Sequence, residues 1–360
     1  MKHLLLCCVA VGLLGSAGQA ADKWGLKEGP VKLQSARTLA FGPDGILFVG
    51  DTKAAAVVAI STGDSKRVEK AGAINVEDIS KLVGGMFDVP GAEITDVAVN
   101  PLSKNVYLSV SVNNRGALVK LTEAGKMSLV SLKNVAHSRV DLPGAPEDKV
   151  IRRGRREYNP RNDTVTDLAW VDGKVIVSGL SMRKSAVREI HFPFVESDTG
   201  ASIEIFHGAH GKLEDYSAIR TFVPFNIDGE PSLLAGYVCT PLVKFPLDGL
   251  KAGEKTKATT VAELGNRNRP LDMIVYEKGG QEWLLMANSA RGIMKISTKD
   301  IADNKGITER VGGGGTAGQP YETIKSWQGV VQLDKLDEGH AVILVAESDT
   351  LHHLKTVELP

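Results

Sequence analysis

Short apolar runs separated by turn residues recur along most of the chain. In residues 39–60, LAFGPDGILFVGDTKAAAVVAI, two apolar runs flank a Pro-Asp-Gly turn and a third run follows a polar break. Runs of this length with Gly, Pro, Asp and Asn between them are typical of antiparallel β-strands. The pattern recurs five more times, in residues 95–121, 166–190, 221–247, 271–297 and 329–357.

The spacing of these units predicts the architecture. Their first strands begin near Leu39, Val97, Leu168, Phe222, Met273 and Val330. A fourth strand fits after each third one, as at 127–132 and 259–264. Each sheet has two apolar faces to bury, so the units should close into a ring. We predict an all-β fold, a single β-propeller of six four-stranded blades over residues 21–360. Seven blades or a pair of β-sandwiches are the alternatives, and residues 21–35 are candidates to close the ring by pairing with the C-terminal strand.

The first twenty residues have the pattern of a signal peptide. Lys2 and His3 precede an apolar run from Leu4 to Leu14, and small residues lead to Ala20. The run is too short to cross a bilayer, although a buried N-terminal helix is an alternative. We therefore expect an exported protein, periplasmic or secreted.

Composition and charge exclude several classes. The chain has 43 basic and 43 acidic residues, which gives no overall attraction to nucleic acid or to an anionic membrane. No further apolar run is long enough for a membrane span, and no CxxCH stretch exists for covalent haem attachment. Removal of residues 1–20 leaves Cys239 without a partner for an internal disulfide. We expect a monomer stabilised by burial.

One stretch carries a family resemblance. FGPDGILFVGD at 41–51 resembles the NHL-type repeat, and the strand grammar is similar to that of SMP-30/gluconolactonase-like propellers and pyrroloquinoline-quinone sugar dehydrogenases. The resemblance implies the fold and a channel mouth as the working place. Where gluconolactonase-like propellers have a metal-binding Glu, this chain has Arg37-Thr38. The quinone enzymes use a His base, and no inner strand starts with one here, so the resemblance implies no mechanism.

Acidic residues occupy the same register at the starts of three inner strands. In a propeller, these starts share one face with the loops between second and third strands. Asp96, Asp167 and Asp272 could together hold Ca²⁺ or Mg²⁺, as in a metal-dependent lactonase or esterase. Alternatively, they cap backbone N–H groups where adjacent blades meet. Thr38 and Thr221 at equivalent positions favour capping, because Thr is a weaker metal ligand.

Arginines from five blades are expected at the same face. They are Arg37, Arg115, Arg183, Arg220 and Arg291. Their guanidinium groups suit a carboxylate, sulfate or phosphate, although pairing with nearby acids would neutralise them. Segments 150–163 and 263–272 should also lie over this mouth.

Two histidines and the remaining cysteine form a weaker candidate. His207 and His210 lie in FHGAHG, and with Cys239 they could hold copper or zinc if the fold gathers them. A solvated loop and a buried, inert thiol are the alternative interpretations, and a reactive thiol on the channel rim is another.

The sequence thus favours a binding propeller that takes a small polar or anionic ligand, or a protein partner, at the channel mouth. The alternatives are a Ca²⁺- or Mg²⁺-dependent hydrolase and a copper or quinone redox protein. Whether the protein is catalytic stays open at this level.

Overall fold

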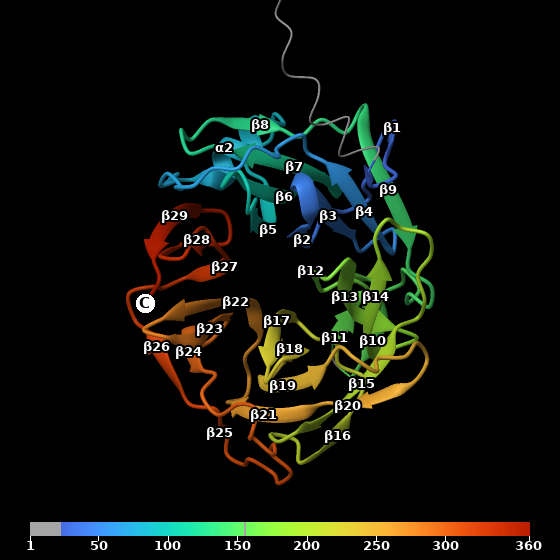
Figure 1. Ribbon diagram of the computed structural model, residues 1–360, viewed down its shortest axis with the longest axis vertical. Helices are drawn as coiled ribbons and strands as arrows, with labels where there is room; N and C mark the ends of the chain where they lie inside the picture. Colours follow the sequence, from blue (N-terminus) through green and yellow to red (C-terminus); the bar gives the residue numbers. More distant parts are fainter. Residues whose placement is uncertain (1–22, 155) are drawn as a thin grey trace, which may run out of the picture.

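The computed structural model describes residues 23–154 and 156–360, so the predicted signal peptide lies outside the described residues. Six sheets are arranged around a central axis as the blades of a propeller, which confirms the predicted fold class (Figure 1). Blade 1 contains β2 (Leu39–Phe41), β3 (Ile46–Asp51), β4 (Ala56–Ser61), β9 (Val135–Asp141) and β1 (Lys27–Gly29). Blade 2 contains β5 (Glu93–Val99), β6 (Val106–Val112), β7 (Arg115–Leu121) and β8 (Met127–Leu129).

The other four blades follow the same inner-to-outer order. Blade 3 contains β12 (Asp167–Val171), β13 (Lys174–Ser181), β14 (Lys184–His191), β15 (Ala201–His207) and β16 (Lys212–Glu214). Blade 4 contains β17 (Thr221–Ile227), β18 (Glu230–Gly236), β19 (Pro241–Pro246), β21 (Thr259–Leu264) and β25 (Thr316–Gly318). Blade 5 contains β22 (Pro270–Lys278), β23 (Gln281–Asn288), β24 (Gly292–Ser297) and β26 (Tyr321–Ile324). Blade 6 contains β27 (Val330–Lys335), β28 (His340–Ala346) and β29 (His352–Glu358).

The remaining elements connect or edge the blades. They are helix α2 (Ile79–Gly85), the 3₁₀ turns η1 (Pro43–Gly45) and η2 (Pro160–Asp163), the hairpin of β10 (Ile151–Arg153) and β11 (Arg156–Tyr158), and β20 (Lys255–Lys257). No helix among the described residues is long and apolar enough to cross a membrane.

The burial of each strand reflects its place in the blade. β3 is buried along its whole length, because both faces of a middle strand pack against neighbouring blades. β15, further from the axis, alternates buried and half-buried residues, as expected where one face is covered. The turn η1 places Asp44 at φ 54°, and its carboxylate accepts hydrogen bonds from the side chains of Trp24 and Lys23. The Pro-Asp-Gly turn is therefore held to the N-terminal segment by these two hydrogen bonds.

The blades do not follow the sequence around the ring. The apolar clusters between blades join blade 1 to 3, 3 to 4, 4 to 5, 5 to 6, 6 to 2 and 2 to 1. Contacts between inner strands give the same order, with β5 against β27 and β12 against β2. Blade 2 thus lies between blades 1 and 6, and Figure 1 shows β5–β8 beside β27–β29.

Because of this order, the outer strands of blades 1 and 6 pair with segments that are distant in the sequence. β9, which follows blade 2 in sequence, pairs with β4 of blade 1, and β1 pairs with β9. Val76, from the connection between blades 1 and 2, bridges to Leu354 at the outer edge of blade 6. The predicted pairing of residues 21–35 with the C-terminal strand is therefore wrong, because blade 2 separates the N-terminal blade from blade 6. The fourth strands predicted at 127–132 and 259–264 are confirmed as β8 and β21.

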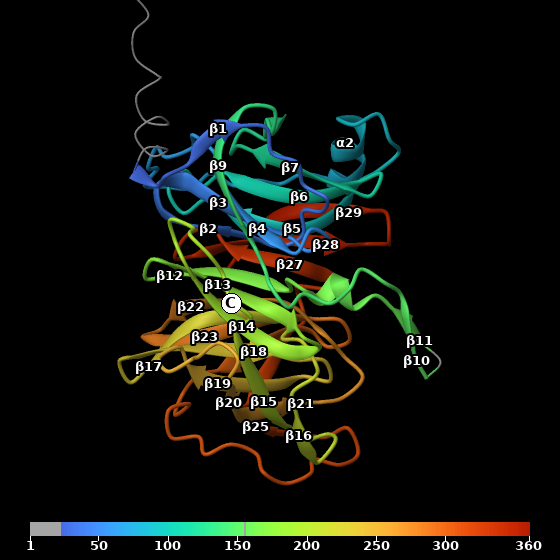
Figure 2. The same ribbon diagram turned by 90° about the vertical axis from the view of Figure 1, so that its right-hand side faces the viewer.

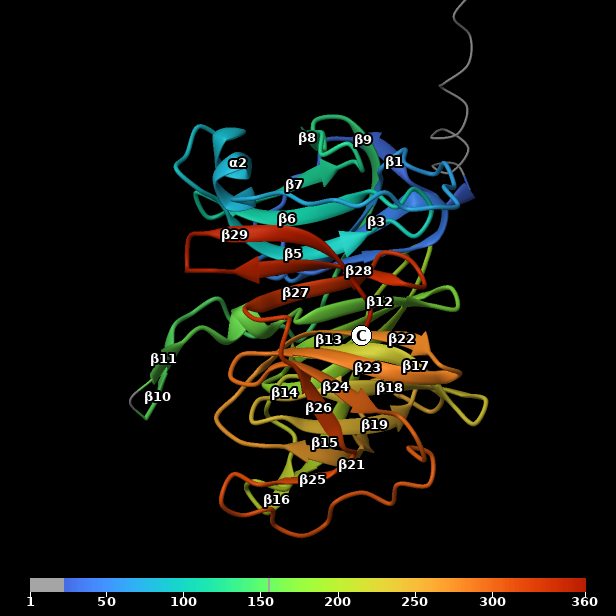
Figure 3. The ribbon, with the colours of Figure 1, turned by 90° about the vertical axis from the view of Figure 1, so that its left-hand side faces the viewer.

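The segment 150–163 only partly covers the mouth. The hairpin of β10 and β11 stands out from one face of the disc (Figures 2 and 3). Of the residues of this segment that the structure describes, Asn162 and Asp163 at its end line the channel.

Candidate functional site

The inner strands place one side chain from each blade at the same level of the channel. In blades 2 and 5 a β-bulge precedes Asp96 and Asp272, and in blade 6 the same bulge precedes Gln332. Gln332 therefore takes the position that the sequence pattern assigned to Gln328-Gly329. The bulge adds a residue that a strand pattern does not reveal. Around the ring the six positions read Thr38, Asp167, Thr221, Asp272, Gln332 and Asp96.

The three acids at this level, Asp96, Asp167 and Asp272, form what we call the aspartate ring. Each carboxylate accepts the backbone N–H of the residue that follows it, at 2.7–2.9 Å. Each also accepts a backbone N–H from the next blade around the ring, at 2.7–2.8 Å; the donors are Leu39, Phe222 and Leu333. The acids thus join blade 2 to 1, blade 3 to 4 and blade 5 to 6, as expected for the capping alternative.

A fourth acid repeats this arrangement deeper in the channel. Asp334 accepts the N–H groups of Lys335 and of Val99 in blade 2, both at 2.7 Å. The sequence pattern missed Asp334 and Gln332. The Gln332 amide, oriented to satisfy its neighbours, donates to Asp96 at 2.9 Å and to Asp272 at 2.7 Å.

The electrostatics of the channel favour protonated acids. Burial raises the pKa of Asp167 to about 7 and that of Asp334 to about 6. Burial, together with mutual repulsion across the channel, raises the pKa of Asp96 and Asp272 well above the usual range. A neutral side chain separates each acid from the next around the ring, which limits the repulsion that adjacent carboxylates would feel.

The predicted working face has a cavity of about 310 Å³, which we call the mouth cavity. Arg37, Arg220 and Arg269 line it, from blade 1, blade 4 and the connection to blade 5. Arg220 pairs with Asp163 at 2.8 Å. Burial and the positive charge of Arg220 lower the pKa of Arg269. The sequence pattern predicted that segment 263–272 lies over the mouth but did not single out Arg269, which directly precedes β22.

The other predicted arginines do not share this cavity. Arg115 lines a separate hollow between blades 1 and 2 that also touches Arg37. Arg183 lines a third, beside Pro160. Arg291 packs against Gly265 and donates to the carbonyl of Asn266. Position in a loop on one face is therefore not enough to bring these five side chains together.

The opposite end of the channel opens into a larger cavity of about 490 Å³. It is lined by the ends of the inner strands, with Lys104, Lys335, Asp337 and Glu338 among them. Lys335 and Glu338 form an ion pair at 2.7 Å. Acids outnumber bases here, because the aspartate ring and Asp334 also line this cavity, whereas the mouth cavity has three arginines beside the ring.

A second cluster lies away from the channel, between blades 3 and 4. The fold gathers His207, His210 and Cys239, whose possible ligand atoms all lie within 4.8 Å of one another. We call these three residues the thiol–imidazole cluster. The histidines come from the β15–β16 hairpin and the cysteine from the β18–β19 turn. Within the described part of the chain, no other set of three or more His, Cys, Asp or Glu residues meets this criterion.

Glu214 anchors both imidazoles and was not found from the sequence. Its buried carboxylate accepts from Nδ1 of His207 at 3.0 Å and from Nδ1 of His210 at 2.8 Å. Burial opposes ionisation of Glu214, but hydrogen bonds from Tyr216 and the two histidines outweigh it and lower its pKa. Burial also lowers the pKa of His207, against the opposing effect of its hydrogen bond to Glu214.

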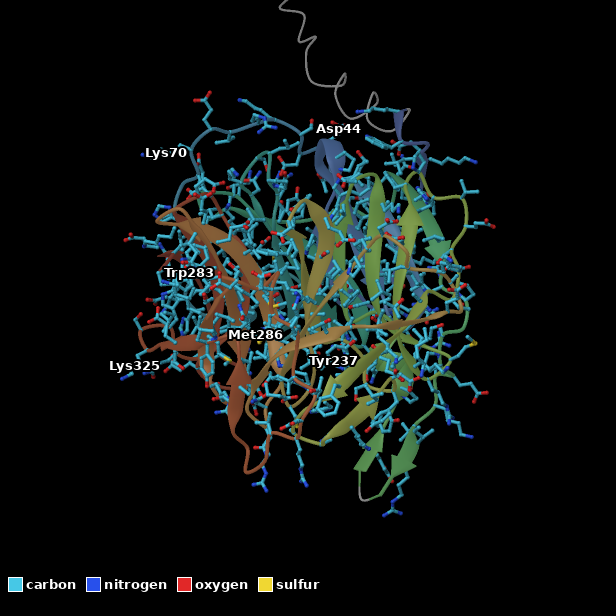
Figure 4. All side chains as sticks on the ribbon, turned by 60° about the horizontal axis from the view of Figure 1, so that its bottom comes forward. Asp44, Lys70, Tyr237, Trp283, Met286 and Lys325 are labelled. Carbon is cyan, nitrogen blue, oxygen red and sulfur yellow. The ribbon has the colours of Figure 1, made fainter. Side chains whose placement is uncertain are left out.

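The turn that carries Cys239 has an unusual backbone. Cys239 and Thr240 have φ values of 64° and 45°, a pair that suits a tight hairpin turn and usually selects Asn or Gly. The equivalent turn of blade 2 uses Asn113 and Asn114. Tyr237, labelled in Figure 4, is buried in the core between blades 3 and 4 at the start of this turn.

The sequence matches no protein-family model, and no curated protein matches it. Solved structures with a similar arrangement include a gluconolactonase from Xanthomonas campestris (TM-score 0.35, 10% identity, covering 91% of this chain and 88% of that one). Others are the PQQ-bound aldose sugar dehydrogenase from Streptomyces coelicolor (0.33, 10%, 92% and 98%) and the allergen Mala s 1 from Malassezia sympodialis (0.37, 10%, 92% and 95%). These scores support no statement about activity.

Proposed function

We propose that this protein is a binding propeller that takes a small anionic ligand in the mouth cavity. The observation that carries the proposal is the gathering of Arg37, Arg220 and Arg269 from separate parts of the ring around one cavity of about 310 Å³. Only one of them, Arg220, has a carboxylate partner in that cavity, Asp163. A bound carboxylate or phosphate would relieve the repulsion between Arg220 and Arg269.

The floor of the cavity is consistent with an anion. The aspartate ring lies there, and burial raises the pKa of all three acids, that of Asp167 to about 7, which favours their neutral form. A neutral carboxyl can donate a hydrogen bond to an anion, whereas a carboxylate would repel it. Binding should therefore weaken as the pH rises through 7.

Isothermal titration calorimetry with inorganic phosphate, sulfate and citrate tests this proposal. We expect at least one anion to bind, and Arg269→Gln to weaken its binding about 10–150-fold, since a charge-assisted hydrogen bond contributes about 1.5–3 kcal/mol. Arg183→Gln, which changes a different cavity, is the matched control. No binding of any of the three anions, or equal binding by Arg269→Gln, would overturn it.

The other functions considered from the sequence stay predictions. Titration with Ca²⁺ and Mg²⁺ tests the hydrolase alternative, which requires a metal at the aspartate ring. For the partner-binding alternative, Arg152→Glu on the projecting hairpin should abolish capture of a partner.

Export requires removal of residues 1–20, so mass spectrometry should find a mature N-terminus at Ala21.

A further inference from the structure

The geometry points to a transition-metal site at the thiol–imidazole cluster. We propose that His207, His210 and Cys239 bind one Zn²⁺ or copper ion, with Glu214 as a positioning residue. The three possible donor atoms already lie within 4.8 Å of one another, although they come from different blades. This proposal does not depend on anion binding in the mouth cavity.

The hydrogen bonds of Glu214 select the nitrogen that can bind metal. An ionised carboxylate only accepts hydrogen bonds, so Nδ1 of both His207 and His210 carries the proton. In a neutral imidazole the lone pair is then on Nε2, which is the nitrogen free to coordinate. A carboxylate behind a ligating histidine is a common arrangement in metalloproteins, because it orients the ring and increases its basicity.

His207 gives an independent sign that a ligand is expected. Its side chain is only 3% exposed, and its Nε2 atom is buried with no hydrogen-bond partner among the described residues. Most buried polar atoms have such a partner, so an unpaired one needs an explanation. A metal ion bound to Nε2 would supply it. His210 is 45% exposed, so solvent reaches the cluster and an ion could enter from this side.

A single segment holds both parts of the cluster in place. Glu263 accepts the backbone N–H of Gly208 in the histidine hairpin. The N–H of Cys239 donates to the carbonyl of Asn268 at 2.9 Å, and the hydroxyl of Thr240 donates to the carbonyl of Gly265 at 3.0 Å. The residues 263–268 therefore fix the cysteine turn relative to the hairpin before any metal arrives, which lowers the cost of binding.

The donor set restricts the ion. One thiolate and two imidazoles suit zinc or copper, whereas Ca²⁺ and Mg²⁺ require oxygen ligands. Three protein ligands also leave a coordination position for water or another molecule. An open position is usual for catalytic zinc sites, whereas structural zinc sites have four protein ligands.

The test uses the purified protein after reduction and chelator treatment. Zn²⁺ and Cu⁺ are titrated against chromophoric chelators, and Co²⁺ serves as a spectroscopic probe. We expect one ion per chain and a thiolate-to-Co²⁺ charge-transfer band. Added Zn²⁺ should also slow the alkylation of Cys239 by iodoacetamide, because the bound thiolate is protected.

Variants assign the ligands. Cys239→Ser should remove the charge-transfer band, and Glu214→Gln should weaken binding about 10–100-fold, the range for residues that orient a ligand. His210→Ala should weaken it more than Glu214→Gln and, because the side chain is exposed, should leave the fold intact by circular dichroism. His340→Ala, an exposed histidine of blade 6 paired with Asp337, is the control and should bind as the wild type does.

Two results would overturn the proposal. One is the absence of a one-to-one site for Zn²⁺, Cu⁺ and Co²⁺ in the reduced wild-type protein. The other is unchanged affinity in folded Cys239→Ser and His210→Ala.

Discussion

The aspartate ring and the thiol–imidazole cluster are both groups of titratable residues that the sequence offered as metal ligands, and they differ in how their polar atoms are paired. Every acid of the ring accepts two backbone N–H groups, one of them from the next blade. In the cluster, the Nε2 atom of His207 is buried and has no hydrogen-bond partner in the part of the chain that the structure describes. Both oxygens of each ring acid accept a hydrogen bond within the fold, so these acids have a structural role already. The thiol–imidazole cluster, in contrast, can still take a ligand at the unpaired Nε2 atom of His207.

If this contrast is correct, removing a ring acid should cost more stability than removing a cluster residue. Asp272→Ala leaves the N–H groups of Met273 and Leu333 without their acceptor, and we expect a loss of about 2–4 kcal/mol in the free energy of unfolding. His210→Ala, at an exposed side chain, should change it by less than about 0.5 kcal/mol. Urea denaturation of both variants measures the difference, and equal losses would remove the contrast. Asp272→Asn keeps an oxygen acceptor and should lie between them.

The ring should also make stability depend on pH. An acid whose pKa is higher in the folded state holds a proton that the unfolded chain releases, so stability falls as the pH rises between the two pKa values. For Asp167, with a folded pKa of about 7, the fall should run from about pH 4 to pH 7. We expect a loss on the order of 2 kcal/mol after allowance for solvent in the channel. Asp167→Asn should flatten this part of the profile, whereas Cys239→Ser should leave it unchanged; an equally steep profile in Asp167→Asn would contradict the assignment.

Metal should stabilise the protein through the cluster and not through the ring. A ligand that binds only the folded state adds about 2.7 kcal/mol when its free concentration is one hundred times its dissociation constant. In thermal melts with Zn²⁺, the wild type and Asp272→Asn should therefore shift to higher temperature, and Cys239→Ser should not. The reverse outcome, a shift lost in Asp272→Asn and kept in Cys239→Ser, would assign the metal to the ring.

The smallest expected effect concerns the cysteine turn. Cys239 has φ 64°, a value that Asn adopts more readily, as Asn113 and Asn114 do in blade 2. Cys239→Asn should therefore raise the stability of the metal-free protein by about 0.5 kcal/mol while abolishing metal binding. A clear loss of stability in urea denaturation would show that the thiol contributes to packing rather than to a site.

Part of this contrast was accessible from the sequence. The strand pattern placed Asp96, Asp167 and Asp272 in one register, and Thr38 and Thr221 at equivalent positions pointed to capping. The spacing in FHGAHG drew attention to His207 and His210. Glu214 and the unpaired Nε2 atom were not accessible, because the pairing of one buried atom depends on neighbours from another part of the fold. The predictions for Arg115, Arg183 and Arg291 show the same limit, since a common face does not imply a common cavity.

The six blades, the first three strands of each and the outer strands β8 and β21 were predictable from the sequence, because alternation of apolar and turn residues is a local property. The three-stranded blade 6 was not. The sequence also did not determine the order of the blades around the ring. The six units resemble one another in pattern, and which apolar face packs on which is decided only when whole sheets meet. In sequence order, Asp96 and Asp167 belong to consecutive units; the folded ring inserts blade 1 and its Thr38 between them, so that no two acids of the ring are adjacent. The meeting of the blade 3 hairpin with the blade 4 turn, which creates the thiol–imidazole cluster, was likewise decided by packing between sheets.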